Sequence, residues 1–365
     1  MSFIIKTAKK IAGLVSAKGN AKPASYLLVD KEQDKIDTAR RLLSNGVLPS
    51  NFSIGLGAAP CNHSCLFCPQ SVEKPKKADW LDLALLEKVL HEMPEKGISL
   101  GLSSYSETLA APNLIPAVRL IKKIRPGLPV IMATNGSLFR PKVIEELIDL
   151  GLDWYSYSFD AASRDDYAAL MQKDDFQIVW DNLEELLAMR AAKSSSMKIT
   201  SHIMAFKGRE KDFEKFTEYW GPKLDGINFR PVANWGSSEI GLKENLARAG
   251  FEGIHEAPEK RYPCMSIFQH FKLQFNGKYY PCVAAIPAYH TEMIDPLGHA
   301  SEMTWGEAWA QLGTMRRAHL EGRWDEFASC RNCNVWGVSY SNVWDEETAS
   351  DGHTRFKIDG VEYSQ

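Results

Sequence analysis

The sequence lacks the features that would mark a secreted, membrane-spanning or polyanion-binding chain. It has no cleavable apolar leader and no apolar run of about 18 residues, so neither a secretory signal nor a membrane span is expected. Neither charge sign is in excess, because 43 basic residues face 46 acidic ones, and a nucleic-acid partner is therefore not expected. Internal repeats and low-complexity segments are also absent. We expect a cytoplasmic globular protein with reduced thiols, long enough for a large and a small domain.

Acidic residues are missing from the first 22 positions, which carry five lysines. Ile4, Ala8, Ile11 and Val15 share one face of a helix, so contact with a membrane surface or an acidic partner is one interpretation. A terminal helix that packs on the body or frays is the favoured one, since chain termini are commonly poorly ordered. Residues 1–49 are assigned to a basic N-terminal helix and extension.

Cysteine is scarce, yet three of the seven cysteines fall in the run Cys61-Asn62-His63-Ser64-Cys65-Leu66-Phe67-Cys68. Three thiolates can hold three irons of a cubane and leave the fourth iron without a protein ligand, whereas a structural zinc site needs a fourth close donor. The spacing therefore favours an iron–sulfur cluster with one open iron.

The C-x3-C-x2-C pattern, with Phe67 before its last cysteine, resembles the radical S-adenosylmethionine (SAM) enzymes over about residues 50–235. The resemblance implies a 4Fe-4S cluster on Cys61, Cys65 and Cys68 whose open iron is chelated by SAM. It also implies reductive cleavage of SAM to methionine and a 5′-deoxyadenosyl radical, which takes a hydrogen atom from the substrate. A flavodoxin- or ferredoxin-type protein is the expected reductant.

Short apolar runs alternate with amphipathic segments from about residue 52, which predicts β-α units and a parallel sheet. Strands are expected at Phe52–Gly57, Ile98–Ser103, Pro129–Thr134, Trp154–Phe159, Lys198–Phe206 and Gly226–Arg230. Helices are expected at Leu81–Met93, Leu114–Ile124, Val143–Leu150, Ile178–Met189 and Asp212–Trp220. Six units are fewer than a closed eight-stranded barrel has, so the fold class is α/β, with a partial (β/α)6 barrel at 50–235.

Four cysteines remain, and four thiolates complete either a closed cubane or a zinc ribbon. Their positions are Cys264, Cys282, Cys330 and Cys333. The first two flank a hairpin predicted at Phe271–Phe275 and Lys278–Val283, whose Asn276-Gly277 pair suits a two-residue turn. The last two follow a helix predicted from Thr304 to Leu320, with Thr304 and Glu307 as its capping box.

This second set resembles the shortened, Twitch-type form of the SPASM auxiliary extension, in which C-x(9–15)-G-x4-C precedes a later C-x2-C. The resemblance implies a second 4Fe-4S cluster in a small α+β domain at 262–345. Behind a radical SAM triad, iron–sulfur is favoured over zinc. Residues 236–261 are expected to be a linker or a substrate-covering segment, and 346–365 a C-terminal tail.

The resemblance also assigns residues to SAM. The family's Gly-Gly-Glu motif corresponds to Ser103-Ser104-Tyr105-Ser106-Glu107, so only Glu107 is kept for the SAM amino group; a solvated loop acid is the alternative. Asn135 and Ser158 end the third and fourth strands, where the family binds ribose and carboxylate, and Phe67 belongs to the same site. The Asn135-Gly136 pair also fits a simple turn.

The triad predicts how a reaction begins, and the second cluster suggests how it ends. A closed cluster can accept an electron, so we expect a radical SAM oxidoreductase that dehydrogenates a small metabolite such as a sugar or aminocyclitol alcohol. Tyr157, His202 and Arg230 are the candidates for catalysis near the proton that is removed. Radical epimerisation, modification of a peptide side chain, and a non-catalytic iron–sulfur electron-transfer or binding protein are the alternatives.

Overall fold

The computed structural model describes most of the chain from residue 48 onward. It covers 37, 39–40, 43, 48–230, 232–233, 241–253, 261–282, 296–331, 333 and 336, together with the backbone of 345–348, 354–358 and 361–364. The predicted basic helix at 1–22 lies outside the described residues.

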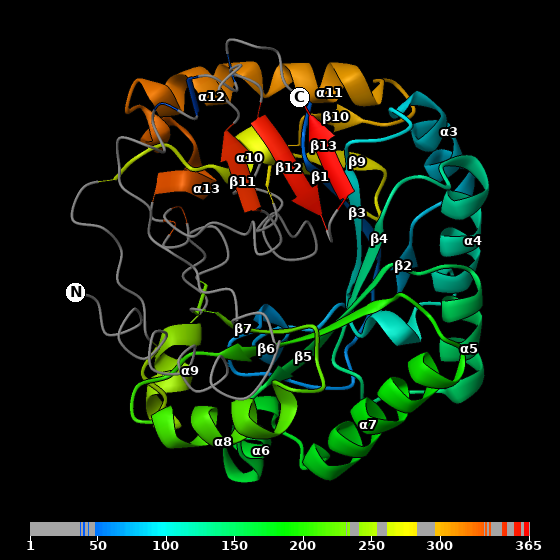
Figure 1. Cartoon of the computed structure of the whole chain (residues 1–365). Coiled ribbons are helices and arrows are strands. Elements are labelled where there is room, and N and C mark those ends of the chain that lie inside the picture. Colours follow the sequence, from blue (N-terminus) through cyan, green and yellow to red (C-terminus); the bar gives the residue numbers. More distant parts are fainter. Residues whose placement is uncertain are drawn as a thin grey trace.

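A curved parallel sheet carries helices on its outer side (Figure 1). Its strands are β1 (Asn51–Ala58), β3 (Ser99–Tyr105), β4 (Val130–Thr134), β5 (Trp154–Asp160), β6 (Lys198–Met204) and β7 (Gly226–Arg230), paired in that order. The outer helices include α3 (Leu83–Glu92), α4 (Leu114–Ile124), α5 (Pro141–Asp149), α7 (Phe176–Ala192) and α8 (Glu210–Trp220). The partial (β/α)6 barrel is confirmed.

Several short elements were not predicted from the sequence. They are β2 (Asp79–Trp80), which pairs antiparallel with β1, the 3-10 turns η1 (Pro69–Ser71) and η2 (Thr108–Ala110), and the helices α6 (Arg164–Met171) and α9 (Leu242–Arg248). The first turn of α6 carries Asp165 and Asp166, so its apolar period is too short to stand out. Helix α9 lies within 236–261, which is expected to be a linker or a substrate-covering segment and for which no helix was predicted.

The two faces of the barrel sheet differ in chemistry. On β5, Tyr155, Tyr157 and Phe159 point toward the helices, and the Phe159 ring lies 5.3 Å from that of Phe176 in α7 and 5.1 Å from that of Phe216 in α8. Side chains alternate along a strand, so the even-numbered residues of β5 face the barrel interior. From Ser156 onward the inner side of β5 is therefore polar, whereas its outer side is aromatic.

The C-terminal part continues the same sheet. Strand β8 (His270–Leu273) runs parallel to β1 with Ser53 opposite Lys272, and β9 (Lys278–Tyr280) and β10 (Gly298–His299) extend the edge. The hairpin is confirmed, but its turn is not the predicted two-residue type. Only Gly277 has a positive φ, of 74°, and its N–H donates to the Gln274 carbonyl at 2.9 Å, so the turn spans four residues.

The predicted helix from Thr304 to Leu320 is two helices, α11 (Trp305–Gln311) and α12 (Gly313–Leu320), separated at Leu312. The capping box of Thr304 and Glu307 is present as predicted. The described residues of this region also form three short elements, namely α10 (Ser266–Gln269), η3 (Trp324–Glu326) and α13 (Ala328–Arg331).

The C-terminal tail expected at 346–365 contains regular structure that the sequence did not predict. Strands β11 (Asp345–Thr348), β12 (Thr354–Ile358) and β13 (Val361–Ser364) form an antiparallel three-stranded sheet. The charged run Asp345–Thr348 has no apolar alternation, which is why the sequence pattern missed its strand.

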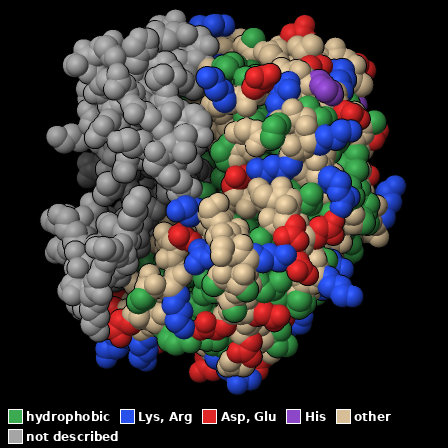
Figure 2. All heavy atoms as spheres, turned by 45° about the vertical axis from the view of Figure 1, so that its right-hand side comes forward, with side chains coloured by type: hydrophobic (Ala, Val, Ile, Leu, Met, Phe, Trp, Pro, Cys, Tyr) green, Lys and Arg blue, Asp and Glu red, His purple; other side chains and the backbone are tan. Residues whose placement is uncertain are grey.

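The visible surface mixes both charges. Figure 2 shows basic side chains interspersed with acidic ones on the described part of this face. Ion pairs connect neighbouring outer helices: Arg119 of α4 pairs with Glu146 of α5, and Lys193, which caps the end of α7, pairs with Asp149 of α5. Among the described helices, none has the length and apolar character needed to cross a bilayer.

Candidate active site

The three-cysteine loop follows β1 and is fixed from two sides. The Cys61 N–H donates to Gln70 Oε1 at 2.8 Å, while Gln70 Nε2 donates to the carbonyls of Ala59 and Tyr105 at 3.1 and 2.7 Å. Lys74 Nζ donates to the carbonyls of Cys61 and His63 at 2.8 and 3.0 Å. Gln70 and Lys74 therefore hold the loop in place, and the cysteine pattern alone gave no sign of either residue.

On its other side the loop is tied to the end of α6. The Ser64 and Leu66 N–H groups donate to the carbonyls of Met171 and Leu170, at 3.3 and 2.8 Å. Phe67 packs on the hydrophobic core beside them. The loop backbone is therefore anchored at residues next to the cysteines.

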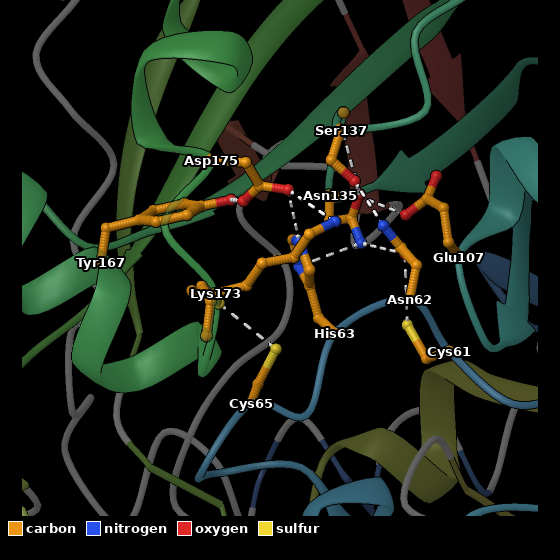
Figure 3. A network of polar contacts seen from close by, with 12 residues as sticks. Cys61, Asn62, His63, Cys65, Glu107, Asn135, Ser137, Tyr167, Lys173 and Asp175 are labelled. Atoms are coloured by element: carbon orange, nitrogen blue, oxygen red, sulfur yellow. Dashed lines mark hydrogen bonds and ion pairs between the residues drawn. The ribbon is translucent and has the colours of Figure 1, made fainter.

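A buried histidine network adds a third anchor (Figure 3). His63 Nε2 lies 3.1 Å from Asp175 Oδ2, and Asn135 Nδ2 lies 3.3 Å from His63 Nδ1. Since Asn135 Nδ2 can only donate, the network assigns the ring proton to Nε2, which donates to Asp175. Asp175 also accepts from Tyr167 Oη at 3.1 Å and pairs with Lys173 at 3.0 Å. Burial works to raise the pKa of Asp175, but its bonds to His63 and Lys173 outweigh it and hold that pKa below its usual range.

The thiols fit a metal cluster. Burial raises the pKa of Cys61 and Cys65, and that of Cys68 to about 12; the pKa of Cys65 is raised further by the charges of Cys68, Asp160 and Cys61. Three thiols so close in a buried site are costly as free thiolates, and a cluster would supply the compensating positive charge. In a cubane each thiolate binds a different iron, so the three cysteines would share one cluster without converging on a single ion.

Glu107 lies beside this loop and is only 3% exposed, so it is not a solvated loop acid. Its Oε1 accepts from the Leu109 N–H at 2.9 Å and from the Thr134 hydroxyl, and its Oε2 accepts from the Asn135 N–H at 2.8 Å. Burial raises the pKa of Glu107, although these three hydrogen bonds oppose the shift. The carboxylate therefore ties β3 to β4, and the outer lone pair of Oε2 is the one left for an amine.

Asn135 makes the turn considered from the sequence and also contacts the cysteine loop. Its Oδ1 accepts from the Ser137 N–H at 3.0 Å, which makes a side-chain turn, and its Nδ2 donates to Asn62 Oδ1 at 3.2 Å as well as reaching His63. Asn62 in turn donates to Ser137 at 2.7 Å. The end of β4 is thereby bonded to the cysteine loop.

Three polar side chains meet on the inner side of β5–β7. His202 Nε2 lies 3.4 Å from Asp160 Oδ1, without hydrogen-bond geometry, and both residues are 6% exposed. Half-buried Arg230 ends β7, and its charge lowers the pKa of both groups. Burial has the larger effect in each case: it raises the pKa of Asp160 to about 7 and lowers that of His202 well below its usual value. Half-buried Ser158 pairs in register with His202.

Asp160 does not cap the helix that follows β5, because the N-cap of α6 is Ser163, whose hydroxyl accepts from the Asp166 N–H. A shift in the β5–β6 pairing between Ser158 and Asp160, with a φ of 61° at Asp160, places the carboxylate beside His202. Strand alternation gives no sign of such a bulge.

Tyr157, a catalytic candidate from the sequence, does not join this group. Its side chain is fully buried on the helix-facing side of β5, and its hydroxyl donates to the Val179 carbonyl at 2.9 Å. The ring packs against Tyr155 and Phe159, at 6.0 and 6.2 Å between centroids. The odd-numbered residues of β5 face the helices. Alternation in the sequence predicts two faces of the strand but not which face is turned toward the helices.

The four remaining cysteines also gather in one place. Burial raises the pKa of Cys264, and the charges of Cys333, Cys330 and Cys282 raise it further. The pKa of Cys330 is raised to about 12 by burial and then by Cys282 and Cys333. A hairpin and two short helices thus bring four thiols within electrostatic range of one another, a donor set that fits a closed cluster.

Comparison with known families agrees with both sites. Residues 60–219 match the Radical SAM superfamily, and residues 264–334 match the SPASM iron–sulfur cluster-binding domain. The chain is a radical SAM enzyme. It belongs to the members that carry a SPASM-type auxiliary domain, and its cofactors are a SAM-binding cluster and an auxiliary iron–sulfur cluster.

Individual relatives are distant. The chain is 24% identical over 235 residues to GTP 3′,8-cyclase of Chlorobaculum tepidum, covering 63% of this chain and 68% of the relative. It is 26% identical over 106 residues to S-adenosyl-L-methionine-dependent 2-deoxy-scyllo-inosamine dehydrogenase of Niallia circulans, covering 28% of this chain and 42% of the relative. The crystal structure of BtrN in complex with AdoMet and 2-DOIA superposes with a TM-score of 0.52 at 19% identity, covering 79% of this chain and 94% of BtrN. That similarity shows the fold.

Proposed function

We propose that this enzyme dehydrogenates an alcohol of a small polar metabolite, such as a sugar or an aminocyclitol. The observation that carries the proposal is the buried carboxyl of Asp160, which faces His202 and acts electrostatically on Cys65 and Cys68. A proton acceptor next to the place where the radical arises is what an alcohol oxidation needs and a simple hydrogen-atom exchange does not. The dehydrogenase among the relatives supports the same reaction class.

In this proposal Cys61, Cys65 and Cys68 hold the first cluster, and Cys264, Cys282, Cys330 and Cys333 hold the second. Phe67, Glu107, Asn135 and Ser158 border SAM. When bound, SAM with the first cluster would supply an acceptor for a hydrogen atom, and the second cluster would supply an acceptor for one electron. A CH–OH group that loses this hydrogen atom, this electron and a proton becomes a ketone. The barrel is proposed to span 50–235 and the auxiliary domain 262–345, which contain the two family matches.

The proton goes to Asp160. A carboxyl whose pKa lies at about 7 is half ionised near neutral pH and can accept a hydroxyl proton there. Neutral His202 lies against it, and Arg230 favours the ionised form of the carboxyl through its charge. His202 and Arg230 are thus proposed to set the position and charge of the base.

The polar inner wall supports a small hydrophilic substrate. On β8, which closes the sheet next to β1, buried His270 lies 2.8 Å from the Ser53 hydroxyl, and buried Lys272 and Gln274 follow on the same face. Hydroxyl, imidazole, ammonium and amide groups along one wall can bind the hydroxyls of a sugar-like ring. A peptide side chain is the competing substrate, and the assay below includes it.

The test is an anaerobic assay of reconstituted enzyme with SAM and dithionite, offered pools of deuterated polyols, aminocyclitols and short peptides. We expect a small-molecule product lighter by two hydrogens, with deuterium transferred to 5′-deoxyadenosine. Asp160→Asn is expected to retain SAM cleavage and lose the oxidation. The control is Asp153→Asn, just before the other end of β5, where the carboxylate pairs with Lys122. Deuterium transfer from a peptide alone, or a product of unchanged mass, contradicts the proposal.

A further inference from the structure

Arg261 lies among the auxiliary cysteines. The charges of Cys330, Cys333 and Cys264 act on its guanidinium, and that guanidinium acts in return on Cys330. Arg261 precedes Cys264 by three residues, and its Nη1 donates to the Arg331 carbonyl, between Cys330 and Cys333, at 3.3 Å. One side chain therefore spans both ends of the four-cysteine set.

Two tryptophans fix the guanidinium. Arg261 Cζ lies 5.0 Å from the ring centroid of Trp324 and 5.5 Å from that of Trp336. Trp336 is itself packed edge-on against buried Tyr262 at 5.0 Å. Aromatic faces on a guanidinium hold its plane while leaving its N–H groups free to point elsewhere.

Those N–H groups are buried without acceptors in the described part of the chain. Arg261 Nε and Nη2 have no hydrogen-bond partner among the described residues, and neither does Nε2 of fully buried His319. His319 Nδ1 accepts from the Cys264 N–H at 3.3 Å, so the ring proton is on Nε2, which is a donor. Buried donors without acceptors are costly, and here the guanidinium lies within electrostatic range of three thiols while His319 contacts the backbone of Cys264.

We propose that Arg261, assisted by His319, donates N–H hydrogen bonds to sulfur of the auxiliary cluster and its cysteines, and thereby raises the reduction potential of that cluster. A reduced cluster carries one more negative charge, so a nearby cation and N–H donors stabilise it relative to the oxidised form. Arg261 is thus a positioning residue that makes the auxiliary cluster a better electron acceptor. The inference rests on the proposed four-cysteine ligand set.

Arg316 is a matched control in the same domain. It is also a buried arginine on a tryptophan, with Cζ 3.5 Å from the Trp309 centroid, and its Nε donates to the Ile267 carbonyl at 2.8 Å. Burial alone lowers the pKa of Arg316, and no cysteine charge contributes. This control therefore separates the general effect of removing a stacked arginine from the specific effect of removing Arg261.

The experiment is a potentiometric titration of the reconstituted holoenzyme followed by electron paramagnetic resonance, with SAM added to identify the first cluster by its altered signal. For Arg261→Gln we expect the reduced-to-oxidised ratio of the auxiliary cluster at a fixed potential to fall at least tenfold, which is about 59 mV in midpoint. Arg261→Lys keeps the charge but loses the planar fork, so a smaller fall of at least threefold is expected. Arg316→Gln is expected to change the ratio less than twofold.

A second readout is deuterium coupling to the auxiliary cluster after exchange into D2O, which Arg261→Gln should reduce and Arg316→Gln should not. An unchanged midpoint in Arg261→Gln, or an equal shift in Arg316→Gln, overturns the inference. If Arg261→Gln retains no second cluster, Arg261→Lys decides by its midpoint. Iron content separates the two hypotheses: about four irons per chain in the parent enzyme means that the ligand set is wrong, whereas about eight with unchanged midpoints means that only the role of Arg261 is wrong.

Discussion

Replacing Asp175 should loosen the loop that carries the first three cysteines, although Asp175 touches none of them. Its carboxylate accepts from His63 and Tyr167 at 3.1 Å each and pairs with Lys173 at 3.0 Å. Asp175→Asn removes the charge but keeps the shape, so the buried His63 N–H loses a charged acceptor. Hydrogen bonds to charged groups contribute about 1.5–3 kcal/mol.

The change should appear as faster iron loss from the first cluster. If release follows opening of the loop, about 1.5–3 kcal/mol raises its rate roughly 10- to 150-fold, because about 1.36 kcal/mol corresponds to a factor of ten. The assay is anaerobic transfer of iron to a ferrous chelator, with the SAM-responsive resonance signal marking the first cluster. Release of auxiliary iron should not change.

The neighbouring residue provides the control. The side chain of Asp174 is 51% exposed and pairs with Arg164 at the surface, so Asp174→Asn should change the rate less than twofold. Equal rates for Asp175→Asn and the parent enzyme, or equal acceleration by both variants, would refute the idea that the histidine network stabilises the loop.

Four further predictions concern the rest of the molecule. Tyr157→Phe should keep full turnover while lowering the free energy of unfolding by about 1 kcal/mol, as urea denaturation would measure, because only its bond to Val179 is lost. Oxidation should rise with pH through about 7 as Asp160 ionises, and a pH–rate profile of Asp160→Asn should lack that limb. Because the folded pKa of Asp160 is raised, its contribution to stability is fully present below its unfolded pKa and is lost as pH rises through about 7; Asp160→Asn should remove this slope from stability measured against pH. Cys330→Ala should lower iron content from about eight to about four per chain and leave the SAM-responsive signal intact.

Hydrophobic periodicity predicted the barrel well because each β-α unit buries a local apolar face. The strand Gly226–Arg230 has the bounds expected, and the other five barrel strands differ by two residues at most. The pairing of β8 with β1 could not be predicted, since no local pattern specifies a partner so distant in sequence. Whether the odd- or the even-numbered residues of β5 face the barrel interior depends on the helices that cover the strand. The sequence alone therefore could not show that Tyr157 faces the helices.

The metal-binding cysteines could be proposed from their spacing in the sequence, because binding a cluster requires several thiols close together. The residues that support them could not. Gln70, Lys74 and Asp175 act through bonds to backbone carbonyls, a backbone N–H or a distant histidine, and such partners leave no spacing in the sequence. Arg261 is ordinary in sequence and becomes conspicuous only when its buried N–H groups are seen beside thiols.

The junction of β1 with β8 also has a consequence for the order in which the chain is synthesised. Ser53 and its partner His270 lie 217 positions apart, so a ribosome adding about 5–20 residues per second delivers β8 about 10–40 s after β1. During that interval β3 to β7 can assemble and β2 can pair with the end of β1, yet the outer edge of β1 at Asn51–Ile54 still lacks its β8 partner and presents its amides to other nascent chains. The cysteine loop that follows β1 can be in place before this edge is covered. Cells making this enzyme quickly are therefore expected to depend on chaperones more for the late closing strand than for the barrel itself.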